Sequence, residues 1–135
     1  MTLDEKIDRF LSAPAFAVVG ASDEKHKYGH KVFICYRQNN RIAYPVNPNA
    51  QTVLGDPCYS SLLELPESVQ SASIITPPAV TKQVVQDAIK AGVKYLWMQP
   101  GAESRSGIEA AENAGIEVIH GGACLLVVLG YRMQP

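Results

Sequence analysis

Residues 17–22, Ala-Val-Val-Gly-Ala-Ser, constrain the fold of this chain more than any other stretch. A short apolar run ends abruptly in a Gly-Ala-Ser turn, and the amphipathic residues 31–38 follow after a polar, basic stretch. This order predicts a strand, a tight turn and a helix, which gather backbone N–H groups and a helix N-terminus around one anion site. Gly20 lets the chain turn and a ligand approach the backbone, and Ser22 can cap the helix or donate to a phosphate oxygen. A turn glycine and a capping serine without any ligand are the competing interpretation.

Length and composition indicate a single globular domain over residues 1–135, since 47% of the residues are hydrophobic and 19% are charged. The net charge of −1 argues against a nucleic-acid partner, and no apolar run is long enough to span a membrane. The N-terminus lacks the basic-then-apolar pattern of a signal peptide, so we expect a cytoplasmic protein. Three cysteines without metal-ligand spacing fit reduced thiols and no metal site.

Strand and helix patterns alternate along the chain. Helical periodicity predicts helices over residues 3–11, 29–38, 80–91 and 106–114, and apolar runs predict strands over 15–19, 41–46, 72–75, 95–98 and 116–119. Residues 52–55 fit a small strand or turn, and residues 60–66 fit one capped helical turn closed by proline. The alternation favours βαβ units with right-handed crossovers. We therefore predict a single Rossmann-like α/β domain whose five-stranded, mostly parallel sheet carries helices on both faces.

Ligands of such sheets bind outside the carboxyl ends of the strands, near the switch in strand order. Four predicted strand ends carry proline, glycine and small polar residues: Gly20, Ala21 and Ser22; Asn47 and Pro48; Thr76, Pro77 and Pro78; and Gln99, Pro100 and Gly101. Loops of this composition suit a rigid cradle for an extended ligand better than an acid–base catalytic centre.

The first turn does not match a dinucleotide site. It has one glycine where G-x-G-x-x-G has three, and the end of the second predicted strand offers no carboxylate for a ribose hydroxyl. A P-loop sequence is also absent. Lys25, Lys27 and Lys31 lie close to the turn. This arrangement suits an adenine nucleotide derivative whose ribose hydroxyls are not bound by a carboxylate. A solvated basic face is the alternative interpretation of these lysines.

Several motifs together resemble the stand-alone CoA-binding domain proteins, which are similar to the nucleotide-binding domain that opens the succinyl-CoA synthetase α subunit and the ADP-forming acyl-CoA synthetases. The resemblance covers the chain from about Phe16 to Cys124. Its motifs are Val18-Val19-Gly20-Ala21-Ser22, Lys27-Tyr28-Gly29, Tyr44-Pro45-Val46-Asn47-Pro48, Gly55, Tyr59-Ser60-Ser61-Leu62, Thr76-Pro77-Pro78 and Trp97-Met98-Gln99-Pro100-Gly101-Ala102-Glu103.

This resemblance implies a Rossmann-like fold that binds coenzyme A, and it implies roles by position. Gly20, Ala21 and Ser22 would hold a CoA phosphate, with Lys27, Tyr28 and Gly29 alongside. Val46, Asn47 and Pro48 would flank the nucleotide. Thr76, Pro77 and Pro78 would wall the adenine or pantetheine side, and Gln99 and Gly101 would lie near the inner end of the ligand.

The chain also departs from the synthetases, which need a second domain with a phosphorylated histidine and a nucleotide-grasping partner. His26, His30 and His120 follow no phosphohistidine motif, so we expect a carrier, sensor or regulatory module for CoA or acyl-CoA without complete catalytic machinery. Two alternatives stay open. One is an enzyme, either a subunit of a split acyl-CoA synthetase or a cysteine-dependent acyl or thiol transferase. The other is an interaction domain with a vestigial nucleotide site.

Cys124 follows two glycines and an alanine and is expected to open the last helix. Because a helix N-terminus stabilises a thiolate, Cys124 is a candidate for a mixed disulfide with CoA or for acyl transfer. A small buried residue is the competing interpretation. Cys35 fits the core of a helix and Cys58 an inert loop position. The apolar residues 125–129 fit either the core or a contact with a second copy or a partner protein.

Overall fold

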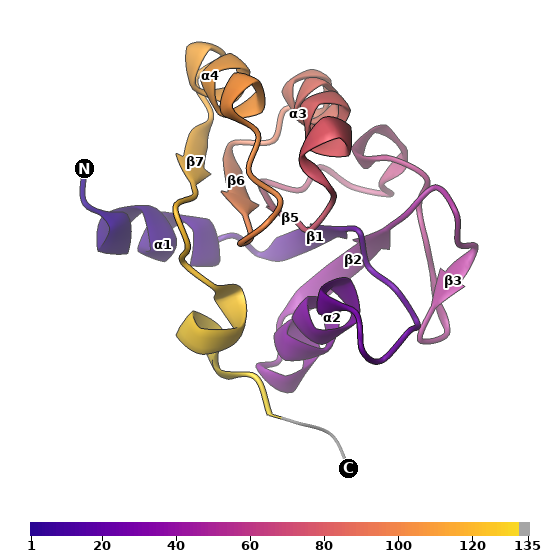
Figure 1. Ribbon diagram of the computed structural model, residues 1–135. Helices are drawn as coiled ribbons and strands as arrows, with labels where there is room; N and C mark the ends of the chain where they lie inside the picture. Colours follow the sequence, from indigo (N-terminus) through magenta and orange to yellow (C-terminus); the bar gives the residue numbers. More distant parts are fainter. Residues whose placement is uncertain (133–135) are drawn as a thin grey trace.

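A computed structural model describes residues 1–132 of the chain. A five-stranded sheet with the order β2-β1-β5-β6-β7 is parallel throughout and carries helices on both faces (Figure 1). Along the chain the elements are α1 (Leu3–Leu11), β1 (Ala15–Val19), α2 (Tyr28–Gln38), β2 (Ile42–Val46), β3 (Thr52–Val53), β4 (Asp56–Pro57), the 3₁₀ turn η1 (Leu62–Glu64), β5 (Ser71–Ile74), α3 (Pro78–Ala91), β6 (Tyr95–Met98), α4 (Arg105–Asn113), β7 (Glu117–Ile119) and the π-helical turn η2 (Leu126–Gly130). The predicted five-stranded α/β fold is confirmed.

The strand order places a switch point at β1. The connection through α2 leads from β1 to its neighbour β2, whereas the chain after β2 crosses back to β5 on the other side of β1. Right-handed crossovers therefore put α2 and α3 on opposite faces of the sheet, as Figure 1 shows. The loops that follow β1, β2 and β5 diverge at this point, which leaves a crevice at the carboxyl ends of the strands.

Alternating side chains of β1 pack into two separate cores. Ala17 and Val19 belong to the cluster with α3, α4 and η1, whereas Phe16 and Val18 belong to the cluster with α1, α2 and the C-terminal segment. This follows from the two-residue period of a strand. Because both faces are covered, every residue of β1 is buried, and the strand holds the crevice in a fixed position.

The structure moves some predicted boundaries. Helix α3 begins at Pro78, two residues before the predicted start, because proline is favoured at the first helical position, where its missing N–H costs nothing. Residues 52–57 form the antiparallel pair β3–β4, and Ser61 caps η1 by accepting from the N–H of Leu63 at 3.2 Å. Within residues 1–132, no helix has the length and apolar character needed to cross a membrane.

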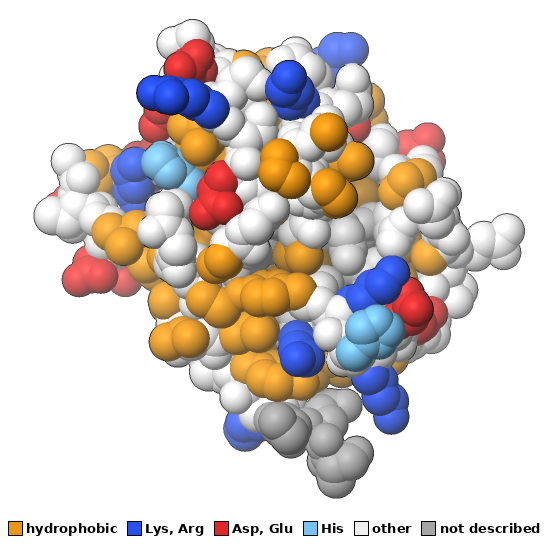
Figure 2. All heavy atoms as spheres, viewed as in Figure 1, with side chains coloured by type: hydrophobic (Ala, Val, Ile, Leu, Met, Phe, Trp, Pro, Cys, Tyr) orange, Lys and Arg blue, Asp and Glu red, His pale blue; other side chains and the backbone are white. Residues whose placement is uncertain are grey.

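The apolar run near the C-terminus is divided between core and surface. Leu125 is fully buried, whereas Val127 is 81% exposed and Val128 is 43% exposed. In the space-filling view, apolar side chains gather over this part of the molecule (Figure 2). The segment is fixed to α2, since the side chain of Asn39 donates to the carbonyl of Gly130 at 3.1 Å.

Candidate functional site

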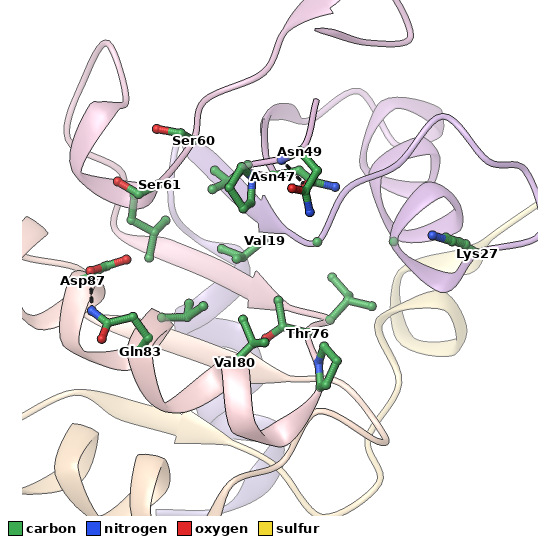
Figure 3. Close-up of a pocket in the computed structure, with 18 of the residues that line it drawn as sticks. Val19, Lys27, Asn47, Asn49, Ser60, Ser61, Thr76, Val80, Gln83 and Asp87 are labelled. Atoms are coloured by element: carbon green, nitrogen blue, oxygen red, sulfur yellow. Dashed lines mark hydrogen bonds between the residues drawn. The ribbon is translucent and has the colours of Figure 1, made fainter. Parts of the chain in front are cut away.

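A cavity of about 650 Å³ opens at the crevice beside β1 (Figure 3). Strand ends, the first turn of α2, the η1 region and one side of α3 surround it. Its lining residues are Val19, Gly20, Lys27, Tyr28, Gly29, Val46, Asn47, Pro48, Asn49, Ser60, Ser61, Leu62, Ile75, Thr76, Pro77, Val80, Gln83, Val84 and Asp87. The cavity therefore lies where the strand order predicts a ligand.

The turn after β1 and the start of α2 are in direct backbone contact. Gly20 has a φ of +102°, a conformation that favours glycine, and its N–H donates to the carbonyl of Val46 at 2.8 Å. A Cβ atom added at Gly29 would lie only 1.9 Å from the Gly20 carbonyl oxygen. Because no side chain separates them, the first residues of α2 lie at the cavity wall, where the positive end of the helix dipole faces a ligand.

Hydrogen bonds from two neighbouring elements hold this turn. The side-chain Nδ2 of Asn47 donates to the carbonyl of Ala21 at 2.9 Å, and His30 Nδ1 donates to the carbonyl of Ser22 at 2.9 Å. The hydroxyl of Ser22 accepts from the N–H of Glu24 at 3.0 Å. Of the two roles considered for Ser22, capping the helix is wrong, because the chain forms a further turn first and α2 starts after Lys27, which makes no side-chain cap.

The charges of the cavity lie at its two ends. Lys27 is the only cationic side chain among the lining residues within the described chain, and its Nζ lies 2.6 Å from Glu24 Oε2, with both side chains about half exposed. Hydrogen bonding to Lys27 and its charge lower the pKa of Glu24. Figure 3 shows Asp87, which accepts from Gln83 Nε2 at 3.2 Å, at the opposite end. The cavity thus has an electropositive end and an acidic end.

Nine of the predicted site residues line the cavity and five do not. The nine are Gly20, Lys27, Tyr28, Gly29, Val46, Asn47, Pro48, Thr76 and Pro77. Ala21 and Ser22 lie in the turn after β1, where their carbonyls accept the hydrogen bonds from Asn47 and His30. Pro78 lines a separate groove with Lys82 and Glu103, because it has become the first residue of α3. Gln99 is fully buried, and Gly101 donates its N–H to the Glu103 side chain at 2.9 Å.

Sequence reasoning missed the far side of the cavity. Besides Val19 at the end of β1, the structure adds Asn49, Ser60, Ser61, Leu62, Ile75, Val80, Gln83, Val84 and Asp87. Four of these residues lie on α3 at the spacing i, i+3, i+4 and i+7, which defines one helix face. The helical spacing that defines this wall was therefore present in the sequence, but a helix face with two valines resembles a face that packs on the core. Val80 is in fact 48% exposed.

Tyr28 connects the cavity with the ends of β6 and β7. Its hydroxyl forms a hydrogen bond with the thiol of Cys124 and lies 3.4 Å from Gln99 Oε1, which also accepts from the N–H of Leu125 at 2.9 Å. Burial, and next the hydrogen bond with Cys124, raise the pKa of Tyr28 well above its ordinary value. The phenol therefore stays neutral and remains a donor over the working range of pH.

Cys35 lies in the core near this group, and burial is the main factor that raises the pKa of its thiol from 9.0 to about 11. An unfolded chain therefore loses this proton at lower pH than the folded chain. We expect the contribution of Cys35 to stability to be complete below pH 9.0 and to be lost as the pH rises to about 11. Urea unfolding at several alkaline pH values should show a steeper loss for the native chain than for Cys35→Ala. Equal slopes would contradict this assignment.

Comparison with known families decides the identity of the domain. The model of the CoA binding domain family matches residues 14–130. The chain belongs to the CoA-binding domain family. The resemblance inferred from the sequence motifs is thereby confirmed.

Relatives and solved structures agree with this membership. The CoA-binding domain is 30% identical over 129 residues to an ADP-forming acetate–CoA ligase I from Archaeoglobus fulgidus, with 88% of this chain and 19% of the ligase covered. It is also 30% identical to the alpha subunit of an ADP-forming acetate–CoA ligase II from Pyrococcus furiosus, with 84% of this chain and 26% of the subunit covered. A hypothetical protein from Pyrococcus horikoshii superposes with a TM-score of 0.87 at 28% identity, covering 94% of this chain and 89% of that protein. The chain thus spans at most about a quarter of these curated relatives.

Proposed function

We propose that this chain binds coenzyme A or an acyl-CoA in the cavity beside β1, as a carrier, sensor or regulatory module that lacks a complete ligase mechanism. The observation that carries the proposal is the contact between Gly20 and Gly29, which leaves the N-terminus of α2 exposed to the cavity at the switch point of the sheet. Such an N-terminus favours a diphosphate. Family membership supplies independent support.

The distribution of charge supports one orientation of the ligand. The diphosphate fits the end with Lys27 and the first turn of α2. The lining also includes the apolar Leu62, Val80 and Val84, and Asp87 lies at the end opposite Lys27. Apolar lining side chains suit a purine ring, and a carboxylate can accept from the exocyclic amine of adenine. The pantetheine arm then leaves the cavity past Tyr28.

Isothermal titration calorimetry of the full chain with reduced coenzyme A tests the proposal directly. We expect micromolar binding of CoA, weaker binding of ADP, and no comparable binding of NAD. ADP shares the adenine and diphosphate but lacks both the pantetheine arm and the 3′-phosphate of CoA, so the difference in affinity measures the contribution of these two groups together. Absence of heat and of a melting-temperature shift with CoA, under reducing conditions, would exclude this function.

Lys27 and Glu24 provide a matched pair of variants for the phosphate end. Because the Lys27 ammonium is half exposed and already pairs with Glu24, we expect Lys27→Ala to weaken CoA binding by only about fivefold. Glu24→Gln frees the ammonium and should tighten binding a few-fold. Both effects should shrink as salt is raised. Calorimetry at low and high ionic strength checks this, and a weaker affinity in Glu24→Gln would argue against a phosphate at Lys27.

A second function is favoured by one relative, whose name describes a separate alpha subunit of an ADP-forming ligase. In this case the chain would supply the CoA site of a synthetase assembled from several polypeptides. The test is acetyl-CoA formation from acetate, ATP and CoA, measured for the chain alone and with ligase fragments that provide the remaining domains. Turnover that requires both parts would support the assembly, and no turnover in any combination would exclude it.

A further inference from the structure

The three thiols of the chain differ in how they are placed around the cavity. Cys35 is fully buried, and its raised pKa leaves little thiolate. Cys58 donates to the carbonyl of Asn47 at 3.6 Å, and burial raises its pKa as well. Cys124 is partly exposed and pairs with Tyr28, which forms part of the cavity wall. Because the thiolate is the nucleophile in thiol chemistry, Cys124 is the thiol best placed to react with a bound ligand.

Gln99, which lies behind the cavity wall rather than in its lining, gives a second observation beside this pair. Its side chain is fully buried, yet Nε2 has no hydrogen-bond partner within residues 1–132. The amide cannot be reversed without facing the N–H of Leu125, which already donates to Oε1 at 2.9 Å. A buried amide donor without an acceptor is costly. The amide of Gln99 lies beside the Tyr28 hydroxyl. A pantetheine arm that displaced the Tyr28 side chain would bring amide carbonyls to this donor.

The topology brings these groups to one edge of the sheet. Gln99 follows β6 and Cys124 lies five residues beyond the end of β7, and both strands run parallel to β1. Their carboxyl ends therefore share the edge where the cavity opens. The tyrosine side chain bridges from the cavity wall to the cysteine, and a pantetheine arm is longer than that side chain. A CoA whose diphosphate lies against α2 can thus bring its sulfur to Cys124.

We propose that Cys124 undergoes thiol–disulfide exchange with coenzyme A disulfide bound in the cavity, which rests on the proposed CoA-binding function. The Cys124 thiolate attacks one sulfur of the CoA disulfide, the bond between the two CoA sulfurs breaks, and a Cys124–CoA disulfide forms. The departing CoA thiolate takes up the proton that the Cys124 thiol released. No further oxidant is consumed, since the CoA disulfide is reduced as the cysteine is oxidised. The neutral phenol of Tyr28 donates to the attacking thiolate.

Binding in the cavity should make the reaction specific. The pantetheine arm tethers the disulfide of the bound ligand near Cys124, and a tether of this length gives an effective concentration on the order of millimolar. Glutathione disulfide offers the same reactive bond without the nucleotide, so it gains nothing from the cavity. We therefore expect coenzyme A disulfide to react at least about tenfold faster than glutathione disulfide at equal micromolar concentration. An excess of ADP, which competes for the nucleotide site, should slow the reaction.

Intact mass spectrometry of the full chain after incubation with coenzyme A disulfide is the test. We expect one adduct with the mass of CoA less two hydrogens, reversed by dithiothreitol and located by peptide mapping on Cys124. The adduct should be lost in Cys124→Ser and kept in the matched control Cys58→Ser. An adduct on Cys58, an adduct that persists in Cys124→Ser, or equal rates with glutathione disulfide would each overturn the proposal.

A separate titration distinguishes failure of this inference from failure of the proposed function. Cys124→Ser is titrated with reduced CoA under reducing conditions, where exchange does not occur. Binding by this variant, together with no adduct on the native chain, would refute the exchange and leave the CoA site in place. Absence of binding by both the native chain and Cys124→Ser would refute the CoA site and the exchange together.

Discussion

Replacing Gly29 with alanine is expected to lower the free energy of unfolding by about 2 kcal/mol or more. The new methyl group would lie 1.9 Å from the Gly20 carbonyl oxygen and 2.8 Å from its carbonyl carbon, so two backbone segments must separate. Overpacking of this kind costs about 3 kcal/mol, and the better helix propensity of alanine returns about 1 kcal/mol. For a chain of this size we expect the melting temperature to fall by about 8 °C. Thermal and urea unfolding measure both quantities.

Binding should suffer in the same variant, since the displaced segments are the turn after β1 and the N-terminus of α2. We expect the affinity for CoA to fall at least tenfold at a temperature where the variant is folded. Gly107→Ala is the matched control, because the nearest atoms that its added methyl group would meet are side-chain atoms of Ser104 and Val85, at 3.2 and 3.3 Å, and not backbone atoms. Gly107→Ala should change stability by less than about 1 kcal/mol and leave binding unchanged. Equal effects of the two substitutions would refute the close contact as the reason for glycine at position 29.

The fold could be predicted in most of its parts because local pattern and global topology agree. The strand over residues 15–19 was predicted to the residue, since its apolar run lies between Pro14 and Gly20. Helix starts were less accurate, because they depend on where the chain completes a turn. Helix α2 begins at Tyr28, one residue before its predicted start, and α3 begins two residues before its predicted start.

The candidate site was predicted on one side only. The predicted residues of the strand ends, such as Gly20, Asn47 and Thr76, line the cavity, because parallel strands bring their carboxyl ends together. The opposite wall depends on how α3 is rotated above the sheet. Valines at positions 80 and 84 suggest a core face, and only the packing of α3 shows that this face continues beyond the sheet into the cavity.

Contacts between side chains far apart in the sequence could not be predicted. Tyr28 and Cys124 are separated by 96 positions, and no periodicity links a residue of the first helix after β1 with one that follows β7. The sequence suggested Cys124 through its place after two glycines, whereas the structure relates it to the cavity through Tyr28. That contact, with the unpaired amide of Gln99, is the observation on which the proposed exchange at Cys124 rests.

Val80→Glu is expected to abolish CoA binding while the fold stays intact. Val80 lines the cavity and is 48% exposed, so the new carboxylate is solvated in the free protein. It also lies in the first turn of α3, which contains no acidic residue and where a negative charge is favourable. A bound nucleotide would strip water from this carboxylate without supplying a cation. We expect at least a 100-fold loss of affinity, about 2.8 kcal/mol, and an unchanged melting temperature.

Gln86→Glu is the matched control for this variant, because Gln86 is an exposed residue of the same helix that does not line the cavity. Both substitutions change the net charge by one unit, so they share any long-range repulsion of a polyanionic ligand. That shared part should weaken at high salt, whereas the desolvation of a carboxylate inside the cavity should persist. Calorimetry of both variants at two salt concentrations separates the two effects. If Val80→Glu bound CoA as Gln86→Glu does, the face of α3 would lie outside the binding site, and the ligand would have to occupy the Lys27 end alone.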